Sequence, residues 1–582
     1  MNQKTLTTSL KELFSHIRSR RKIQLIFLSL LMIASGSLEI LSIASIVPFV
    51  RLVTELNFIK ETYFVSRFIE IKDKQEAVII LGLIFSSLYL LNSLVRVFLI
   101  YCTAWISKMT TAELSINIYK SILYSSYSNH ILKNSNSIIS DITTRVYQIG
   151  AMLSSIINFA SFTFIFICII AVLISIDPKV MTISMLFFSL LYLLIVLLSK
   201  KKISLSSRII NQEQNNIVKS LQNGLGAIRD IILDKTQEYY IRVFEKSSFQ
   251  KSRKEAILEV IQNSPRYILE GMGIFFFVLL LIYWSQTKTS DQFLLIFPTL
   301  AALAVGAQRI LPMMNSLYSN FIIIKQYYYQ LNEVVDKLNK YSEFIKEKYN
   351  ITEKNISFKN LITFKDVSFS YDNKVKIFEN INLKIKKGSK VGIIGKTGEG
   401  KSTFLDLLMG LLEPSDGKII IDDMELTKET LNDWQAKISH VPQNIFLSDG
   451  SFLENIAFGK DVKNVDYKEI ISAAKKSQIH DFIDGSTDGY NSNVGERGTK
   501  LSGGQIQRIG LARALYKKSK IIIFDEATNS LDNETEKLVM NELNNLDKEL
   551  TLIIVAHRLN TLKDCDLILK IDDKKIVQSE II

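Results

Sequence analysis

The stretch VGIIGKTGEGKST, residues 391–403, decides the architecture of the C-terminal part of this 582-residue chain. It fits the pattern G-x-x-x-x-G-K-[ST] from Gly395 to Ser402, directly after an apolar strand and before the helical run TFLDLLMGLL. In that setting the backbone N–H groups of the turn can surround phosphate oxygens, helped by the positive end of the helix. Lys401 would reach the β and γ phosphates of a nucleotide, and Ser402 would hold Mg²⁺. The alternative is a glycine-rich turn that fits by chance, which the flanking strand and helix disfavour.

Further short apolar runs alternate with helical patterns from about residue 360 onward. KIIIFDEA (520–527) and TLIIVAHR (551–558) are two of them, and this alternation predicts a parallel sheet with crossover helices. The first run ends in Asp525, which suits support of a magnesium shell, and Glu526, which suits general-base activation of water. His557 follows the second run, where a neutral imidazole could contact the γ-phosphate, although a lone histidine more often has a structural role.

The first 325 residues carry the long apolar runs that are typical of a membrane domain. Six of them can cross a bilayer core of roughly 30 Å, which takes about 20 helical residues. They lie near residues 23–50, 77–103, 152–176, 180–199, 267–285 and 292–312. Two connections, after the second and the fourth segment, are long, helical in pattern and rich in Lys and Arg. We expect them to be helices that continue into the cytoplasm, with contact points near residues 129–141 and 224–233.

Composition narrows the class of protein. The net charge of +12 comes from Lys and Arg that flank the apolar runs, so cytoplasmic loops beside an anionic leaflet explain it better than nucleic-acid binding does. The chain has 3 cysteines, far apart, which predict neither a disulfide framework nor a zinc site. The basic N-terminus has no cleavage site of small residues, so we expect the first span to be retained with its basic flank in the cytoplasm.

The run LSGGQIQR, residues 501–508, resembles the signature motif of ABC transporter ATPases. Other motifs follow the order of that family. Tyr371 in FSYDN resembles the aromatic residue that stacks on adenine, and Gln443 in VPQNIF resembles the glutamine that senses Mg²⁺. GERG (495–498) resembles the exporter-type loop before the signature, and SLD (530–532) resembles the subunit-contact loop.

The resemblance implies a set of functional residues. The nucleotide-binding residues would be Tyr371, Gly395, Lys396, Thr397, Gly398, Glu399, Gly400, Lys401, Ser402, Thr403, Gln443, Ser502, Gly503, Gly504, Gln505 and Asp525. The catalytic residues would be Glu526, His557, Gln443 and Lys401, and Mg²⁺ would be held, partly through water, by Ser402, Gln443 and Asp525. Glu399 departs from the family, which usually has a small residue there. An acid near phosphates should weaken nucleotide binding, and we expect its side chain to point outward.

The same resemblance implies the domain organisation. Residues 1–325 would form an all-α transmembrane domain of exporter type with six helices, residues 326–358 a helical extension and linker, and residues 359–582 an α/β nucleotide-binding domain of ABC type. In this family Ser502 and Gly504 complete the ATP site of the opposite subunit. The chain is therefore expected to work as a homodimer that ATP closes and hydrolysis reopens, in the inner membrane, with its N-terminus and ATPase domain in the cytoplasm.

Four ionisable residues inside or near the apolar segments are candidates for substrate contact: Glu39, Arg96, Glu270 and Arg309. A charged side chain at mid-bilayer is costly and persists mostly where it faces protein or water. For each residue a role other than substrate contact is also possible. Arg309 could snorkel to the inner interface, Glu39 could pair with Arg96, and helix packing explains Glu270 adequately.

A second, weaker resemblance concerns the cargo. SLEILSIASIVPFV (37–50), NSPRYILEGMG (263–273) and QRILPMMN (308–315) look like the membrane domains of bacterial flippases for lipid-linked oligosaccharides, of the PglK type. That resemblance implies Arg309, then Arg96, as contacts for a polyprenyl-diphosphate head group, and a short outer helix near residues 51–72. An ordinary loop helix is an equal alternative for that segment.

We therefore expect an ATP-driven flippase or exporter of a lipid-linked glycan. The alternative is an exporter of a peptide, a lipid or another hydrophobic compound, driven by the same ATPase domain. A nucleotide-gated channel or sensor that does not turn ATP over is a third possibility, which Glu526, His557 and the signature motif argue against.

Overall fold

The computed structural model describes residues 5–45, 49, 74–132, 141–176, 178–287, 297–350, 354–371, 375–526, 533–544, 549–556 and 562–579. The chain divides into two compact units. The first consists of Met1–Ser125 and Leu132–Ile345, and the second of Ser126–Ile131 and Lys346–Ile582. The boundary after the long helices thus falls at residue 345, within the segment 326–358 that was expected to be an extension and linker.

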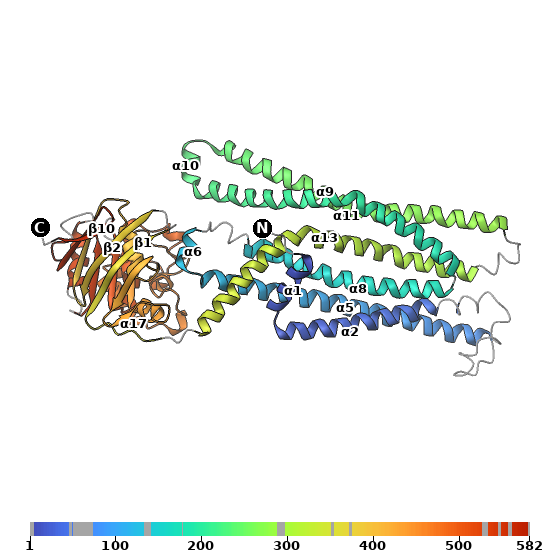
Figure 1. The fold of residues 1–582 in the computed structure, drawn as a ribbon, viewed down its shortest axis with the longest axis horizontal. Coiled ribbons are helices and arrows are strands. Elements are labelled where there is room, and N and C mark those ends of the chain that lie inside the picture. Colours follow the sequence, from blue (N-terminus) through green and yellow to red (C-terminus); the bar gives the residue numbers. More distant parts are fainter. Residues whose placement is uncertain are drawn as a thin grey trace. The chain divides into compact units, whose positions relative to one another are not determined.

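The first unit is helical (Figure 1). Its elements are α1 (Leu6–His16), α2 (Ser19–Ala44), α5 (Lys74–Leu123), a π-helical turn η2 (Asp141–Arg145), α8 (Val146–Ile176), α9 (Pro178–Gly226), α10 (Ile228–Leu233), α11 (Gln237–Thr287) and α13 (Phe297–Asn350). As expected, the long helices run on well beyond the apolar segments that they contain. α5 has 50 residues, which at 1.5 Å per residue is about 75 Å, more than twice the bilayer core.

Five helical segments of the described residues are long and apolar enough to cross a membrane. They are Ser19–Ala44, Val78–Leu123, Ile142–Ser175, Thr182–Gly226 and Gln237–Tyr283. They agree with the first five expected spans and make the chain a multi-pass membrane protein. The sixth expected span, 292–312, begins outside the described residues, and α13 follows from Phe297. The expected outer helix near residues 51–72 also lies outside them.

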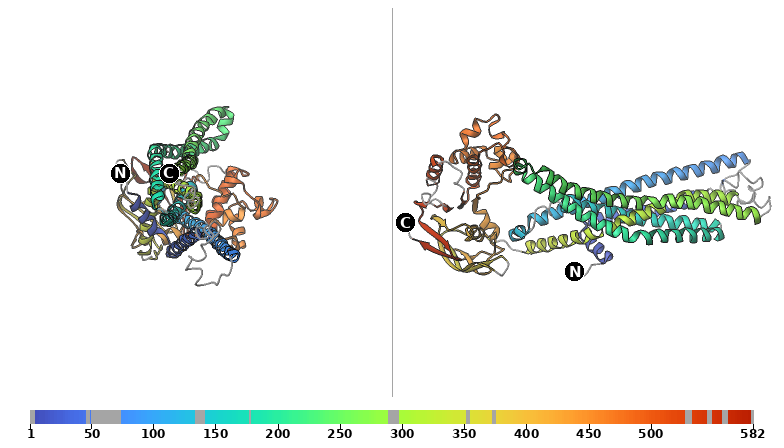
Figure 2. Two further views of the ribbon diagram at one scale, coloured as in Figure 1. Left: turned by 90° about the vertical axis from the view of Figure 1, so that its right-hand side faces the viewer. Right: turned by 90° about the horizontal axis from the view of Figure 1, so that it is seen from above.

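Apolar packing holds the helices of the first unit together. α2 packs on α5 and α8, and α9 runs beside α11, as a second view also shows (Figure 2). One core cluster joins Leu13 of α1, Leu114 of α5, Ile149 of α8 and Val335 of α13. The N-terminal helix is thereby fixed to the far end of α13, which places the segment 326–345 in this unit.

Many apolar side chains on α5, α9 and α11 are exposed, as lipid contact requires. Leu94 is 68% exposed, Leu190 68% and Ile274 68%. In water such surfaces would favour aggregation, so these faces are consistent with the membrane assignment.

The second unit contains two sheets. An antiparallel sheet has the order β2-β1-β4-β5, and a mostly parallel sheet has the order β10-β9-β3-β8-β7-β6, in which β10 alone pairs antiparallel. The strands are β1 (Leu361–Ser370), β2 (Lys376–Lys386), β3 (Lys390–Ile394), β4 (Asp416–Ile421), β5 (Met424–Glu425), β6 (Ile438–Val441), β7 (Ile521–Asp525), β8 (Thr551–Val555), β9 (Leu567–Asp572) and β10 (Lys575–Ser579). The predicted parallel sheet with crossover helices is confirmed.

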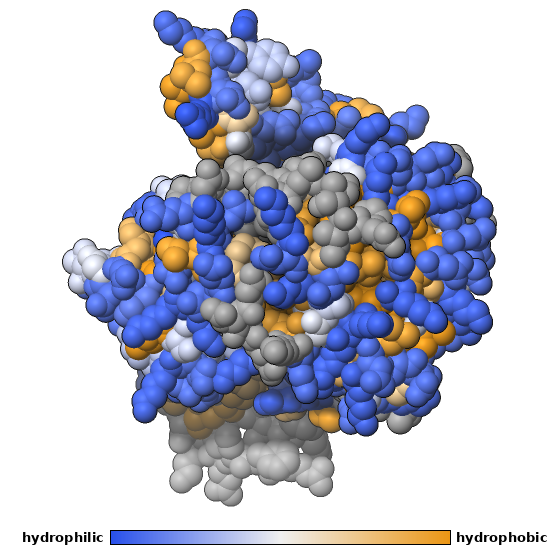
Figure 3. All heavy atoms as spheres, turned by 90° about the vertical axis from the view of Figure 1, so that its left-hand side faces the viewer, coloured by the Kyte–Doolittle hydropathy of each residue, from blue (hydrophilic) through white to orange (hydrophobic). Residues whose placement is uncertain are grey.

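The second unit also contains helices. They are α6 (Tyr127–Leu132), α14 (Lys401–Leu408), α15 (Leu431–Ala436), α16 (Phe452–Ile456), α17 (Tyr467–Lys476), α18 (His480–Asp484), α19 (Gly503–Tyr516) and α20 (Asn533–Asn544), with 3₁₀ turns at Val462–Asn464, Gly489–Asn491 and Glu496–Gly498. α14 lies in the core shared by both sheets, where Phe404 packs against Phe364 with ring centroids 5.2 Å apart. On the face drawn in Figure 3 hydrophilic side chains predominate, as expected for a domain in water.

Gly150 lets α5 and α8 approach closely. A Cβ placed there would lie 2.0 Å from Thr111 Oγ1, and Ser107 Oγ donates a hydrogen bond of 2.8 Å to the Gly150 carbonyl oxygen.

We predict that Gly150→Leu forces the two helices apart and lowers the melting temperature of the detergent-solubilised protein, since overpacking costs about 1–3 kcal/mol. Gly271→Leu on α11 is the matched control, because a Cβ placed there would meet no atom of another described segment within 4 Å. Equal melting temperatures for the two variants would contradict this.

Candidate functional site

The phosphate loop lies between β3 and α14 and keeps the geometry that its sequence predicts. Gly398 and Gly400 have φ angles of 91° and 102°, which side chains other than glycine rarely adopt. At Gly400 space is also short, because a Cβ would lie 2.9 Å from Ile377 and 3.0 Å from Phe378. Lys401 is buried, and its Nζ donates to the carbonyl oxygens of Gly395 at 2.8 Å and Lys396 at 3.2 Å. The loop is thus shaped around the position of the lysine ammonium.

Glu399 is folded back on the loop. Its Oε2 accepts a hydrogen bond of 2.7 Å from the backbone N–H of Lys396, and the Glu399 N–H in turn donates to the Lys396 carbonyl oxygen. The side chain therefore closes the turn on which it lies, instead of extending outward as expected from the sequence. It also interacts electrostatically with Lys570 of β9, which offsets part of its charge.

Three carboxylates gather next to the loop. Asp525 ends β7, and Glu526 follows it with a left-handed φ of 53°, a strained geometry for a residue other than glycine. Burial and the charge of Glu526 raise the pKa of Asp525, while Lys401 acts in the opposite direction. Burial and the charge of Asp525 raise the pKa of Asp406, on α14, to about 6. The three carboxylates carry more negative charge than the Lys401 ammonium balances, which favours a cation.

Gln443 joins this cluster from the loop after β6. Its Nε2 donates a hydrogen bond of 2.8 Å to Glu526 Oε2. The amide oxygen remains an acceptor that a cation could use. The structure thus brings together Lys401, Gln443, Asp525 and Glu526 from separate parts of the sequence.

Tyr371 stands at the end of β1, beside the first turn of α14. Its hydroxyl lies 3.1 Å from Thr403 Oγ1, and its ring packs edge-on against Phe369. Tyr371 is 45% exposed, so part of its surface is accessible to a ligand. Tyr127 of α6, which belongs to this unit, interacts with Tyr371 and Asp406, and burial raises its pKa.

The signature motif lies at the start of α19, in a separate helical part of the unit with its own core cluster. Ser502 caps the helix. Its Oγ accepts from the Gln505 N–H, and Gln505 Oε1 accepts from the Ser502 N–H at 2.8 Å, a reciprocal capping box. The N-terminal turn with Gly503 and Gly504 thus presents backbone N–H groups at a fixed helix start, which suits an anion.

His557 and the segment 530–532 lie outside the described residues. The segment 129–141 is described only to Leu132, where α6 ends, and again from Asp141. The other expected contact segment, 224–233, contains α10.

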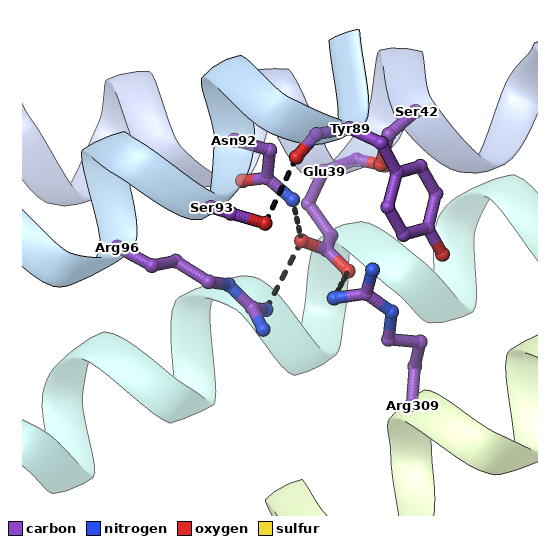
Figure 4. Close-up of polar contacts among 7 residues, drawn as sticks. All are labelled: Glu39, Ser42, Tyr89, Asn92, Ser93, Arg96 and Arg309. Atoms are coloured by element: carbon purple, nitrogen blue, oxygen red, sulfur yellow. Dashed lines mark hydrogen bonds and ion pairs between the residues drawn. The ribbon is translucent and has the colours of Figure 1, made fainter. Parts of the chain in front are cut away.

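The first unit contains a charged cluster in its apolar helices (Figure 4). Glu39 of α2 is fully buried, and its two carboxylate oxygens face different arginines. Arg96 Nη2 of α5 lies 3.0 Å from Oε2, and Arg309 Nη1 of α13 lies 3.3 Å from Oε1. Asn92 Nδ2 donates to Oε2 at 2.5 Å, and the Arg309 guanidinium lies over the Tyr89 ring, 4.6 Å from its centroid. We call these five residues the Glu39 cluster.

The pairing explains how Arg309 is tolerated in an apolar helix. An isolated arginine at mid-bilayer costs about 2.5–3.5 kcal/mol on insertion scales. Opposite charges 3.3 Å apart attract by about 5 kcal/mol at an effective dielectric constant of about 20, before desolvation is subtracted. Arg309 therefore has a counter-charge within the helix bundle, and the expected pairing of Glu39 with Arg96 is present. Glu270, by contrast, pairs with Arg266 one turn away on its own helix.

Tyr89, Asn92 and Asp406 were not predicted from the sequence. A helical pattern could have indicated the first two, because Tyr89, Asn92 and Arg96 are spaced by three and four residues and share one face of α5. No sequence signal marks Asp406, since its perturbed pKa depends on burial beside Asp525, more than 100 positions away.

We predict that Asp406→Asn stabilises the nucleotide-free protein at pH 8. The folded pKa of about 6 exceeds the ordinary value of about 3.9, so ionised Asp406 opposes folding above pH 6 and ceases to do so as the pH falls below about 4. The free energy of unfolding rises by up to roughly 3 kcal/mol at pH 8, and this increase vanishes near pH 4. Thermal unfolding of the second unit as a function of pH measures it. Asp416→Asn, at an exposed position at the start of β4, is the control. A gain that does not depend on pH would contradict the prediction.

We also predict that Glu399→Gln and Glu399→Ser both raise ATP affinity roughly two- to tenfold, because each removes a negative charge from the phosphate loop. Fluorescent-nucleotide binding in a Glu526→Gln background measures this without turnover. Glutamine can still accept from the Lys396 N–H, so a gain for serine alone would assign the effect to the hydrogen bond and not to charge.

Comparison with known proteins matches both units. Residues 25–315, half of the chain, match the ABC transporter transmembrane region, and residues 378–529 match the family described as ABC transporter. An ATP-dependent lipid A-core flippase of Francisella tularensis is 29% identical over 392 residues, 64% of this chain and 62% of the flippase. A heavy metal tolerance protein of Schizosaccharomyces pombe is 41% identical over 218 residues, 38% of this chain and 26% of that protein.

The match thus spans less than two thirds of the length of these relatives. Among solved structures, a bacterial Atm1-family ABC exporter with ATP bound has a TM-score of 0.74 and 21% sequence identity, over 96% of this chain and 94% of that one. That likeness confirms the expected fold, a helical transmembrane domain followed by an α/β domain. The chain belongs to the ABC transporter family, as a half-transporter with the transmembrane region and the nucleotide-binding domain in one polypeptide.

Proposed function

We propose that this protein hydrolyses ATP to move a lipid-linked oligosaccharide, or a related polyprenyl-diphosphate glycan, across the inner membrane. One observation supports ATP hydrolysis. Side chains that are far apart in sequence meet beside the phosphate loop: Lys401, Gln443 and the Asp525–Glu526 pair. Another supports an anionic cargo, since two guanidinium groups converge on one point of the helix bundle.

Each residue of the nucleotide site has a role in this proposal. Tyr371 stacks on adenine, the loop N–H groups from residue 396 to 403 and Lys401 bind the phosphates, and Glu526 polarises the attacking water. His557 contacts the γ-phosphate. The left-handed backbone of Glu526 and its bond to Gln443 hold the carboxylate at the edge of the cluster.

The residues present fit Mg²⁺. The hydroxyl of Ser402, the amide oxygen of Gln443 and the carboxylate of Asp525 are hard oxygen donors. Burial, and then the charge of a neighbouring carboxylate, raises the pKa values of Asp406 and Asp525, and a cation beside them would relieve that repulsion. When bound, Mg²⁺ neutralises charge on the β and γ phosphates. Gln443 connects this position with Glu526 through its other amide atom.

The proposed working form is a homodimer. Ser502 and Gly504 begin a helix in a different core cluster from the one that holds the phosphate loop, so one chain offers two half-sites. In the proposed dimer each signature helix closes the ATP site of the other chain. The N-terminus and the nucleotide-binding domain would lie in the cytoplasm.

The cargo assignment follows from the chemistry of the Glu39 cluster. A guanidinium offers a permanent charge and a planar fork of donors that matches phosphate oxygens. Arg309 and Arg96 are 20% and 27% exposed, so a head group can reach both. The similar lipid A-core flippase supports a lipid cargo in general. An exporter of a peptide, another lipid or a hydrophobic compound is the alternative function.

The decisive experiment measures ATPase activity in proteoliposomes. We expect a polyprenyl-diphosphate glycan to stimulate phosphate release, whereas peptides and simple phospholipids do not. Glu526→Gln should retain ATP binding and lose phosphate release. Arg309→Gln should keep basal ATPase activity and lose stimulation at least tenfold, because the head group loses one of its two cations.

Arg266→Gln is the matched control, since Arg266 is a more exposed arginine that pairs along its own helix. Stimulation by a peptide but not by the glycan would favour the alternative cargo. Normal phosphate release by Glu526→Gln would overturn the assigned base.

A further inference from the structure

We infer that Glu39 is a built-in competitor for the anionic head group: it holds the two arginines before the head group arrives and drives release of the head group after transport. This inference rests on the proposed function, because it assigns a regulatory role within the same site. It makes Glu39 neither a substrate ligand nor only a structural counter-ion.

The geometry of the carboxylate supports this role first. Its two oxygens each face a different guanidinium, at 3.0 and 3.3 Å, so Glu39 bridges Arg96 and Arg309. Two oxygens of one phosphate group would bridge the same pair in the same way. Glu39 thus occupies the arrangement of cations that an anionic head group would need.

The cluster also leaves hydrogen-bonding capacity unused. Within the described residues, Arg96 Nε and Nη2, Asn92 Oδ1 and Glu39 Oε1 are buried without a hydrogen-bond partner. The contacts of Glu39 with the arginines are therefore ion pairs of short distance but poor hydrogen-bond alignment. Buried donors of this kind are uncommon in a purely structural cluster.

The exposure of the arginines and the net charge of the cluster also support this role. Glu39 is fully buried, whereas the side chains of both arginines are partly exposed, so a head group that approaches the cluster meets an arginine side chain before the carboxylate. Two arginines and one glutamate leave a net charge of +1. That surplus attracts an anion, while the fixed negative charge of Glu39 limits how tightly the anion is held.

Asn92 holds the Glu39 side chain, whereas Ser42 contacts only the Glu39 backbone. Asn92 Nδ2 donates to the carboxylate at 2.5 Å, and Ser42 Oγ donates to the Glu39 backbone carbonyl oxygen at 2.9 Å. Because the competitor is tethered, it can return to the arginines in every cycle. A head group that leaves the site is then replaced by a negative charge that is already present.

The inference predicts opposite effects on binding and on turnover. Glu39→Gln keeps the size and an acceptor oxygen but removes the charge. In proteoliposomes we expect the glycan concentration for half-maximal ATPase stimulation to fall three- to tenfold and the maximal stimulated rate to fall as well, because release slows. Asn92→Leu, which changes no charge but removes the tether, should shift the half-maximal concentration in the same direction by a smaller factor. A purely structural role would lower the amount of folded protein without lowering that concentration.

A second measurement does not depend on the natural cargo. Thermal stabilisation by farnesyl diphosphate is compared with that by farnesol in the full-length protein, in a Lys401→Ala background that weakens diphosphate binding at the nucleotide site. We expect farnesyl diphosphate to stabilise Glu39→Gln at a concentration at least threefold lower than the parent protein, and Glu39→Gln/Arg309→Gln to lose this gain. Farnesol should have no such effect.

The outcomes separate the two proposals. If the glycan fails to stimulate the parent protein while farnesyl diphosphate still binds the Glu39→Gln variant more tightly through Arg309, the proposed cargo is wrong and the competitor role stands. If a folded Glu39→Gln variant binds farnesyl diphosphate no more tightly than its parent, the competitor role is overturned, whatever the cargo.

Discussion

A carboxylate that is fully buried between two guanidinium groups joins three helices of the first unit, α2, α5 and α13. In an apolar helix bundle each of these charges alone would be costly, and removing one partner from a buried pair typically costs about 3–5 kcal/mol. The registers of the three helices are therefore coupled, since a shift of one turn on any of them separates the charges.

The nucleotide-binding unit contains a comparable cluster of charges, but here the excess charge is negative. Asp406, Asp525 and Glu526 lie close together, and burial with mutual repulsion raises the pKa of two of them. Lys401 is drawn into the phosphate loop by backbone carbonyl groups. The site thus gathers negative charge that a bound Mg²⁺ would balance. In the first unit the uncompensated charge is complementary to the proposed head group, and in the second unit it is complementary to Mg²⁺.

Sequence patterns predicted most of this architecture because they are local. The phosphate loop needs glycine at positive φ within eight residues, the strands need short β-branched runs, and the membrane helices need long apolar segments. Glu399 was a partial exception. Its departure from the family was evident from the sequence, but its folding back onto Lys396 depends on a hydrogen bond that no pattern specifies.

The sequence by itself therefore determined the class of each unit, the order of its motifs and the identity of the ionisable residues in the apolar helices. Only the tertiary structure decided which charges meet. Glu39, Arg96 and Arg309 lie on three helices separated by more than 50 and 200 positions, and Gln443 reaches Glu526 from 83 positions away. Such pairings depend on helix register and packing between distant segments, whereas one sequence shows only periodicity along the chain.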